Sequence, residues 1–267
     1  MEYQLLVLDV DGTLLDSQHT LRPRVAAAVR AAGAAGLNVT LATGKLLGSV
    51  QSLLAEMQIS GPQIVLNGAA TCDSATDAPL RFCPLEPATR KTIIELVRAF
   101  DPSVLVSCFG LDTIYMDTTH PLIGVFAEYG EGPPVMTPDL LADNLPPTAK
   151  ILLSGAPAQL AALRATMAPH LPLGVVMTTT TPDFLELFDA QAGKGLALAA
   201  LRTQLGIPKA RVIAMGDGEN DAPLLREAGL AVAMANGAAV TRAQAQRIAP
   251  SNDDEGVAVF LEELLSY

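Results

Sequence analysis

The chain has 267 residues, half of them hydrophobic, and a formal net charge of −11. This length allows one large domain or two modest ones, and the composition is typical of a globular protein rather than a disordered one. The acidic balance argues against partners such as nucleic acid or an anionic membrane surface. If the protein handles phosphate, it must do so with a few local cations.

The cysteines and the N-terminus bear on the cellular compartment. Cys72, Cys83 and Cys108 show no CxxC spacing and cannot all pair with one another, which favours reduced thiols. The first residues lack the basic and apolar regions of a signal peptide, and no run of about 18 uncharged apolar residues is present. We therefore expect a cytoplasmic protein without a membrane partner.

Strand and helix signals alternate at the start of the chain. Short apolar runs at 3–10, 37–43 and 62–68 predict buried strands, and the segments 22–36 and 46–58 predict helices. This order predicts a βαβαβ half of a parallel sheet whose strands are covered on both faces.

The middle of the chain shows a different pattern. It contains five strand-like runs, two helical segments and one long loop that is rich in proline and glycine. The strands are expected at 104–109, 113–117, 149–155, 174–180 and 183–188, the helices at 87–100 and 157–171, and the loop at 129–148. This pattern predicts an inserted α+β domain with antiparallel strands.

The last part of the chain returns to the first pattern. Helices are expected at 193–206, 220–229, 237–246 and 256–266, and strands at 210–217 and 230–234. We therefore predict an α/β fold in which a Rossmann-like parallel-sheet core, residues 1–82 and 188–267, is interrupted by an α+β domain at 83–187.

Carboxylates follow two of the predicted core strands. Asp9 and Asp11 follow the first strand, and Asp217 and Asp221 follow the strand at 210–217. The carboxyl ends of parallel strands face one shared crevice, so these side chains can meet there. Because a buried carboxylate is costly unless it is paired, a cation such as Mg²⁺, which prefers oxygen ligands, would account for the acids.

Several other motifs are excluded. An EF-hand loop would need Gly and Glu where the chain has Leu14 and Thr20, and the glycine-rich segments fit neither a Walker A loop nor a dinucleotide fingerprint. No GxSxG elbow is present, and His19, His120 and His170 are scattered. A zinc site or a serine hydrolase therefore has no support.

Four motifs stand in the order found in the haloacid dehalogenase-like (HAD) superfamily. They are DVDGTL at 9–14, ATGK at 42–45, GKG at 193–195 and GDGEND at 216–221. The segments NGA at 67–69, VAMANG at 232–237 and SNDDEGVA at 251–258 resemble the Cof-like subgroup of that superfamily. The inserted domain lies at the C2 cap position, and its strand-rich character resembles a type IIB cap. The resemblance covers essentially the whole chain.

The resemblance implies a phosphatase that hydrolyses small phosphate monoesters, such as sugar phosphates, through an aspartyl-phosphate. Asp9 would be the nucleophile, and Asp11 would be the general acid and then the general base. Thr43 and the Gly44 amide would bind the phosphoryl oxygens, and Lys194 would neutralise their charge.

The resemblance also implies a Mg²⁺ site and its surroundings. The ligands would be the Asp9 side chain, the Asp11 backbone carbonyl and Asp217. Asn220 would support the metal and the substrate, and Asp221 would support the metal, either as a ligand or by holding the ligands in place.

Some positions depart from the family pattern or allow two interpretations. Lys45 stands where arginine is usual; we assign it to substrate binding, although lysine lacks the planar fork of arginine. Asn67 fits the outer part of the site and a plain turn equally well. Asp253 and Asp254 fit a charged loop near the rim of the site.

Other functions are also compatible with the motifs. Asp9 and Asp11 could be turn residues, since Asp-Gly is a common turn pair. The same scaffold serves phosphomutases and phosphotransferases, which pass the phosphoryl group to a sugar hydroxyl. A non-catalytic sensor of phosphorylated ligands is a third alternative, although it would not need both Asp9 and Asp11. The oligomeric state is left open.

Overall fold

The computed structural model describes residues 2–266 and divides into two compact units. Unit 1 contains the described residues up to Arg81 and those from Gly193 onward, and unit 2 spans Phe82–Ala192. Unit 1 is built on a parallel sheet and unit 2 on a mainly antiparallel one. The predicted α/β class, with a parallel-sheet core and an inserted α+β domain, is confirmed.

Five parallel strands form the main sheet of unit 1, in the order β14-β13-β12-β1-β2. Their bounds are β1 Leu5–Leu8, β2 Asn38–Leu41, β12 Val212–Gly216, β13 Leu230–Met234 and β14 Arg247–Ala249. Every residue of β1 and β12 is buried, as expected for central strands with helices on both faces.

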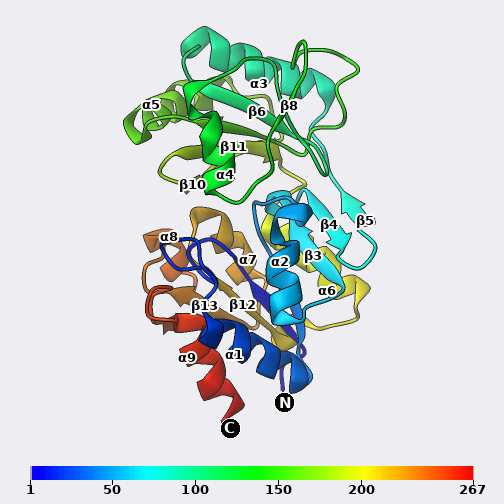
Figure 1. The fold of residues 1–267 in the computed structure, drawn as a ribbon, viewed down its shortest axis with the longest axis vertical. Coiled ribbons are helices and arrows are strands. Elements are labelled where there is room, and N and C mark those ends of the chain that lie inside the picture. The colour runs from blue at the N-terminus through cyan, green and yellow to red at the C-terminus, as the bar shows by residue number, and fades with distance from the viewer. Residues whose placement is uncertain (1, 267) are drawn as a thin grey trace. The chain divides into compact units, whose positions relative to one another are not determined.

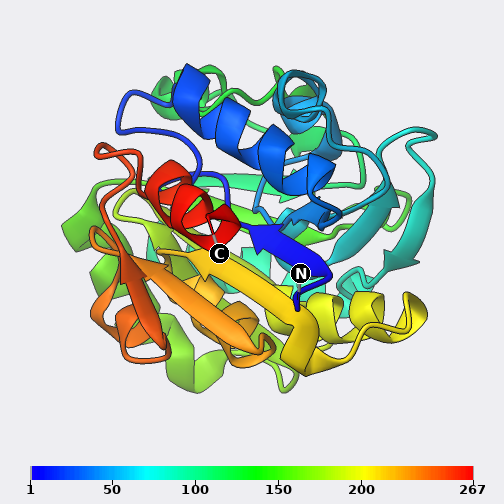
Figure 2. The same ribbon diagram turned by 90° about the horizontal axis from the view of Figure 1, so that it is seen from below.

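Helices cover both faces of this sheet. They are α1 Pro23–Ala34, α2 Leu47–Met57, α6 Lys194–Gln204, α7 Ala222–Arg226, α8 Ala239–Arg242 and α9 Gly256–Leu265. Figure 2 shows α1 and α9 along one face and α6 along the opposite face. On the α6 face, Leu198 and Leu201 pack with Leu5 and Val7 of β1 in one apolar core. The helices therefore bury apolar side chains of the strands on both faces of the sheet.

The pairing predicted for the third strand of the parallel sheet, at 62–68, is wrong for most of its length. β3 (Pro62–Val65) touches the end of β2 through one parallel bridge, Ala42–Ile64, and otherwise pairs antiparallel with β4 (Ala70–Asp73). β4 lies between β3 and β5 (Pro79–Phe82) in a separate three-stranded sheet (Figure 1). The chain reverses directly after β3, because Leu66 and Asn67 adopt φ values of 54° and 56°.

Unit 2 contains a six-stranded sheet in the order β10-β11-β9-β6-β7-β8. The strands are β6 Leu105–Phe109, β7 Ile114–Met116, β8 Val135–Met136, β9 Lys150–Ser154, β10 Val175–Thr181 and β11 Phe184–Asp189, and the helices are α3 Pro87–Phe100, α4 Val125–Glu128 and α5 Pro157–Met167. All pairs are antiparallel except β7 with β8. One face packs against α3 and α5 (Figure 1), where Ile93, Val97 and Leu160 join Ile151 and Leu187 in the core.

Some elements of unit 2 extend beyond the predicted bounds. β8 lies inside the segment expected to be a loop, and β11 continues to Asp189, which pairs with Val175 of β10. Unit 2 accordingly reaches Ala192, past the predicted boundary at 187. Within residues 2–266, each helix is too short or too polar to cross a membrane.

Candidate active site

Three carboxylates meet at the carboxyl ends of two neighbouring strands of unit 1. Asp9 directly follows β1, and its amide donates to the Met215 carbonyl of β12 at 3.0 Å. Asp217 directly follows β12, and Asp221 ends the short 3-10 turn that comes next. One oxygen from each of these carboxylates lies within 4.8 Å of the other two. The structure thus brings together the three acids whose side chains were expected near a metal. The predicted contribution of Asp11 is its backbone carbonyl, and that role stays a prediction.

Lys194 supplies the positive charge of this cluster. It is the first residue of α6, and its Nζ donates to Asp9 Oδ1 and to Asp221 Oδ1, each at 2.6 Å. Its side chain is only 1% exposed. The preceding Gly193 has a φ of 101°, a conformation that glycine adopts readily. The turn at Gly193 therefore directs the Lys194 ammonium between the two carboxylates.

Negative charge exceeds positive charge in this cluster. Burial, followed by the charge of Asp221, raises the pKa of Asp9 well above its usual value, although Lys194 opposes this rise. Burial and the charge of Asp221 also raise the pKa of Asp217 to about 7. Burial alone would lower the pKa of Lys194, but Asp221 and Asp9 raise it above its usual value. Three carboxylates around one ammonium group thus carry negative charge that a second cation could neutralise.

The donor atoms present suit a divalent metal ion. Asp217 Oδ1 accepts a hydrogen bond from Thr13 Oγ1 at 2.8 Å, and a side chain at Gly12 would collide with Asp217 Oδ2. Carboxylate oxygens with excess negative charge are the ligands that hard cations such as Mg²⁺ prefer. Asp9 and Asp217 are the side chains that would hold the ion directly.

Asp221 is already engaged by the protein. Its Oδ1 faces Lys194, and its Oδ2 accepts the amides of Asp217 and Gly218 at 3.0 Å and 2.9 Å. Gly216 makes this possible, since a Cβ atom there would meet Asp221 Cγ at 2.6 Å. In this structure Asp221 therefore holds Lys194 and the Asp217 loop in place, and its role as a metal ligand stays a prediction.

A second network joins the loop after β2 to Asn220. Thr43 is fully buried, and its Oγ1 accepts the Lys45 amide at 3.1 Å; Gly44 lies half-buried between the two. Asn67 donates its amide to the Thr43 carbonyl at 2.9 Å, and its Oδ1 accepts Asn220 Nδ2 at 2.8 Å. Asn67 is thus a turn residue that also connects Thr43 and Asn220, and the roles of these residues toward the substrate stay predictions.

Gly68 fixes the distance between the Asn67 turn and the start of α6. Its φ is 86°, and a Cβ atom there would collide with the carbonyl group of Gly193, whereas a Cβ atom at Gly36, with a φ of 98°, would meet open space. We expect Gly36→Ala to lower the free energy of unfolding by about 1–2 kcal/mol, the cost of the left-handed conformation. Gly68→Ala should lower it clearly more, because backbone atoms must also move. Denaturant unfolding of both variants would measure the difference, and equal losses would contradict the close approach.

Asp11 and Lys45 contact each other. Lys45 Nζ lies 3.2 Å from Asp11 Oδ1, the Lys45 side chain is 8% exposed, and the Asp11 side chain is 27% exposed. The motif position of Lys45 predicts contact with the substrate; in the structure its ammonium faces the predicted acid–base residue instead. Contact of Lys45 with a substrate stays a prediction.

The motifs alone did not point to two polar residues of the site. Thr13 bonds to Asp217, and Asn236 Nδ2 donates to the Gly12 carbonyl at 2.9 Å. Both residues lie within segments that resemble family motifs, DVDGTL and VAMANG. The motif letters could have marked them as candidates, but the partner of each side chain depends on how the two loops approach each other.

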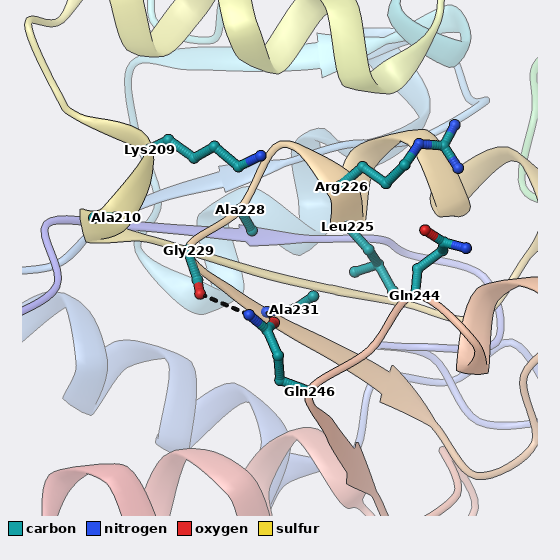
Figure 3. Close-up of a pocket in the computed structure, with 9 residues that line it drawn as sticks. All are labelled: Lys209, Ala210, Leu225, Arg226, Ala228, Gly229, Ala231, Gln244 and Gln246. Atoms are coloured by element: carbon teal, nitrogen blue, oxygen red, sulfur yellow. Dashed lines mark hydrogen bonds between the residues drawn. The ribbon is translucent and has the colours of Figure 1, made fainter.

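A separate hollow of about 650 Å³ lies elsewhere on unit 1 (Figure 3). Lys209, Gly229 and Gln246 line it, and the Gln246 amide donates to the Gly229 carbonyl at 3.0 Å. These residues precede β12, β13 and β14, so the hollow lies at the amino ends of the parallel strands. The carboxylates lie at the opposite ends of the strands, and the hollow is therefore not part of their site.

Comparison with known proteins agrees with this arrangement. The family model described as haloacid dehalogenase-like hydrolase matches residues 6–261. The candidate phosphatase YxeH of Bacillus subtilis is 29% identical over 98% of both chains. The B. subtilis 5-amino-6-(5-phospho-D-ribitylamino)uracil phosphatase YitU is 26% identical over 98% of this chain and 97% of its own.

A solved structure extends the likeness to three dimensions. A haloacid dehalogenase-like hydrolase from Bacteroides thetaiotaomicron superposes with a TM-score of 0.85 at 26% identity, over 98% of this chain and 99% of that one. Family, sequence relatives and fold therefore agree over nearly the whole length. The chain belongs to the haloacid dehalogenase-like hydrolases, in their Cof-like subgroup, and is a phosphatase of that family.

Proposed function

We propose that this phosphatase requires Mg²⁺ and hydrolyses small phosphate monoesters, such as sugar phosphates, through an aspartyl-phosphate on Asp9. The observation that carries the proposal is the cluster of Asp9, Asp217 and Asp221 around Lys194. It combines a buried carboxylate, an ammonium group 2.6 Å from it, and excess negative charge that a metal ion would offset. The name of the relative YitU, a phosphatase of a phosphorylated ribityl compound, is consistent with this substrate class.

The first half of the reaction transfers the phosphoryl group to Asp9. A carboxylate oxygen of Asp9 attacks phosphorus, the bond between phosphorus and the ester oxygen breaks, and Asp11 donates a proton to the leaving alcohol. Lys194, close to the attacking carboxylate, would offset the negative charge on the phosphoryl oxygens, and Thr43 and the Gly44 amide would orient them.

The second half regenerates the enzyme. Asp11, now ionised, takes a proton from a water molecule, and the water oxygen attacks phosphorus. The bond between phosphorus and the Asp9 oxygen breaks, which releases inorganic phosphate and restores the Asp9 carboxylate. When bound, Mg²⁺ would neutralise charge on the phosphoryl group and on Asp9.

A panel of phosphorylated sugars, sugar alcohols and nucleotides, assayed with Mg²⁺ and with EDTA, would test the proposal. We expect release of inorganic phosphate from at least one sugar or sugar alcohol phosphate and its loss with EDTA. Phosphate that appears on a second sugar instead of in solution would indicate a phosphotransferase or phosphomutase. Tight binding without turnover across the panel would contradict the proposal and favour a sensor.

Stabilisation of the protein by Mg²⁺ should increase with pH. The pKa of Asp217 is about 7 in the folded protein, above its usual value of 3.8, so below about pH 7 a proton competes with the metal. In the metal-free protein between about pH 4 and 7, the folded chain keeps this proton whereas the unfolded chain releases it. Stability of the metal-free protein therefore falls as pH rises through this range. We expect the rise in Tm caused by millimolar Mg²⁺ to be larger at about pH 8 than at about pH 5.5.

Asp217→Asn is the matched variant for this measurement. It removes the competing proton and a ligand together, so Mg²⁺ should raise its Tm little at either pH. A Mg²⁺ effect on the unchanged protein that does not vary over this pH range would contradict competition between the ion and a proton on Asp217, and a full Mg²⁺ effect on Asp217→Asn would show that Asp217 does not hold the ion.

A further inference from the structure

The two oxygens of the Asp11 carboxylate have different surroundings. Oδ1 is buried and accepts no hydrogen bond from the described residues, although the Asp11 side chain as a whole is 27% exposed. Two nitrogens face this buried oxygen: Lys45 Nζ at 3.2 Å and His19 Nδ1 at 3.5 Å. The exposure of the carboxylate therefore lies on the side of Oδ2.

His19 reaches Asp11 from a tight turn closed by Asp16. Oδ1 of Asp16 accepts the amides of Gln18 and Thr20, each at 3.0 Å, and its Oδ2 accepts Arg22 Nε at the same distance. His19 donates its own amide to the Asp16 carbonyl at 2.9 Å and has a φ of 55°. A left-handed residue other than glycine is uncommon, and its position here is fixed by a closed set of hydrogen bonds.

The same turn is anchored to a distant part of unit 1. The Ser17 amide donates to Asp253 Oδ1 at 2.8 Å, and Asn252 Nδ2 donates to the Leu15 carbonyl at 2.9 Å. Asp253, expected near the rim of the site, thus holds the loop that carries His19. The loop is tied at Asp16 and at Ser17, on the chain directly before His19.

We propose that His19 is a positioning residue, which acts with Lys45 to hold Asp11 Oδ1 and so present Oδ2 to the leaving-group oxygen. This inference rests on the proposed function, in which Asp11 transfers the proton. A single lysine is a point charge without the planar fork of the arginine usual in the family, and it leaves the rotation of a carboxylate less restricted. The His19 ring nitrogen, 3.5 Å from the same oxygen, adds a second polar neighbour and restricts this rotation further.

Two substitutions separate the contact from the backbone turn. His19→Gly accepts the left-handed conformation and removes the imidazole, whereas His19→Asn also accepts this conformation and can place an amide nitrogen near the position of Nδ1. Gln18→Ala, at the exposed neighbouring position, is the control for general disturbance of the loop. Tm measurements on all three would show whether the fold is kept.

The decisive measurement compares two classes of substrate. Alkyl phosphates need a proton on the leaving oxygen, whereas p-nitrophenyl phosphate releases a stable anion and needs it much less. We expect His19→Gly to lower kcat for an alkyl phosphate by about 10- to 100-fold, and for p-nitrophenyl phosphate by only a few fold, with KM nearly unchanged. His19→Asn should recover most of the loss, and Gln18→Ala should behave like the unchanged protein.

Equal losses on both substrates, or full activity of His19→Gly, would overturn the inference. A crystal structure of His19→Gly provides a readout that does not depend on turnover: the Asp11 carboxylate should be rotated or disordered, and an unchanged orientation would also overturn the inference. If the unchanged protein hydrolyses no monoester while Asp11 still moves in the variant, the proposed function fails and the positioning of Asp11 by His19 stands.

Discussion

Asp9→Asn should abolish phosphate release while leaving the folded protein at least as stable as before. Replacement of a nucleophile typically costs several powers of ten, and we expect kcat to fall by about 10⁴-fold or more. The asparagine of this variant keeps a side-chain oxygen that can accept from Lys194 but cannot form the covalent intermediate. Steady-state phosphate release would measure the loss, and ³²P labelling of the acid-quenched protein would detect the aspartyl-phosphate only in the unchanged protein.

Stability separates loss of chemistry from loss of fold in this variant. Burial and the charge of Asp221 raise the pKa of Asp9, so the ionised carboxylate costs more free energy in the metal-free folded protein than in the unfolded chain. A neutral asparagine relieves this repulsion, and Tm without metal at about pH 8 should be unchanged or a few degrees higher. Asp143→Asn, the same change at an exposed carboxylate of unit 2, should keep full activity. Substantial turnover or labelling of Asp9→Asn would contradict the assignment of the nucleophile.

The central strands and the acids behind them could be predicted from the sequence. The apolar runs of β1 and β12 end directly before Asp9 and Asp217, and parallel strands leave their carboxyl ends at one edge. The position of Asp9 and of Asp217 directly after a strand therefore predicted that the two acids lie close together. The buried Lys194 could be placed only through the family resemblance, since a Gly-Lys-Gly turn taken alone suggests a surface lysine.

Strand pairing is where the prediction of the fold failed. The segment at 62–68 is as apolar as a parallel strand, but short apolar runs do not specify a partner. Two consecutive left-handed residues, Leu66 and Asn67, turn the chain back so that β4 pairs with β3. β14 was missed for another reason: Arg247 and Ile248 are exposed at a sheet edge, so the run has no apolar pattern.

The contacts around the acids depend on distances that no sequence pattern contains. Thr13 and Asp217 are 204 residues apart in the chain, and Asn67 and Asn220 are 153 apart, yet each pair shares a hydrogen bond. In the sequence His19 is one of three scattered histidines, because its contact with Asp11 arises only from the turn closed by Asp16. Such contacts follow from the tertiary fold, and the motifs show only that polar residues are present.

Lys194→Met should be both inactive and strongly destabilised, because Lys194 serves two purposes in one place. Its ammonium offsets the negative charge of the transition state, and it is also a cation within hydrogen-bonding distance of two buried carboxylates. Removal of one partner from a buried ion pair leaves unpaired charge and typically costs about 3–5 kcal/mol. We expect a loss of this size in the free energy of unfolding at about pH 8, and a fall in kcat of about 10³-fold. Lys209→Met, at an exposed lysine, is the matched control and should change neither quantity appreciably.

The sign of the pH dependence and a double variant distinguish this cause from simple loss of packing. Without the ammonium, nothing opposes the rise in the pKa of Asp9, so the folded variant binds this proton more tightly than its unfolded chain does, and its stability should rise as pH falls from about 8 to 5.5. Lys194→Met combined with Asp221→Asn removes one of the unpaired carboxylates, and we expect it to recover a large part of the lost stability while kcat stays low. A pH-independent deficit that the second substitution does not reduce would show that the methylene chain of Lys194, and not its charge, stabilises the fold. Recovery of stability without recovery of turnover is the result that would assign the ammonium group both to the stability of the acid cluster and to phosphoryl transfer.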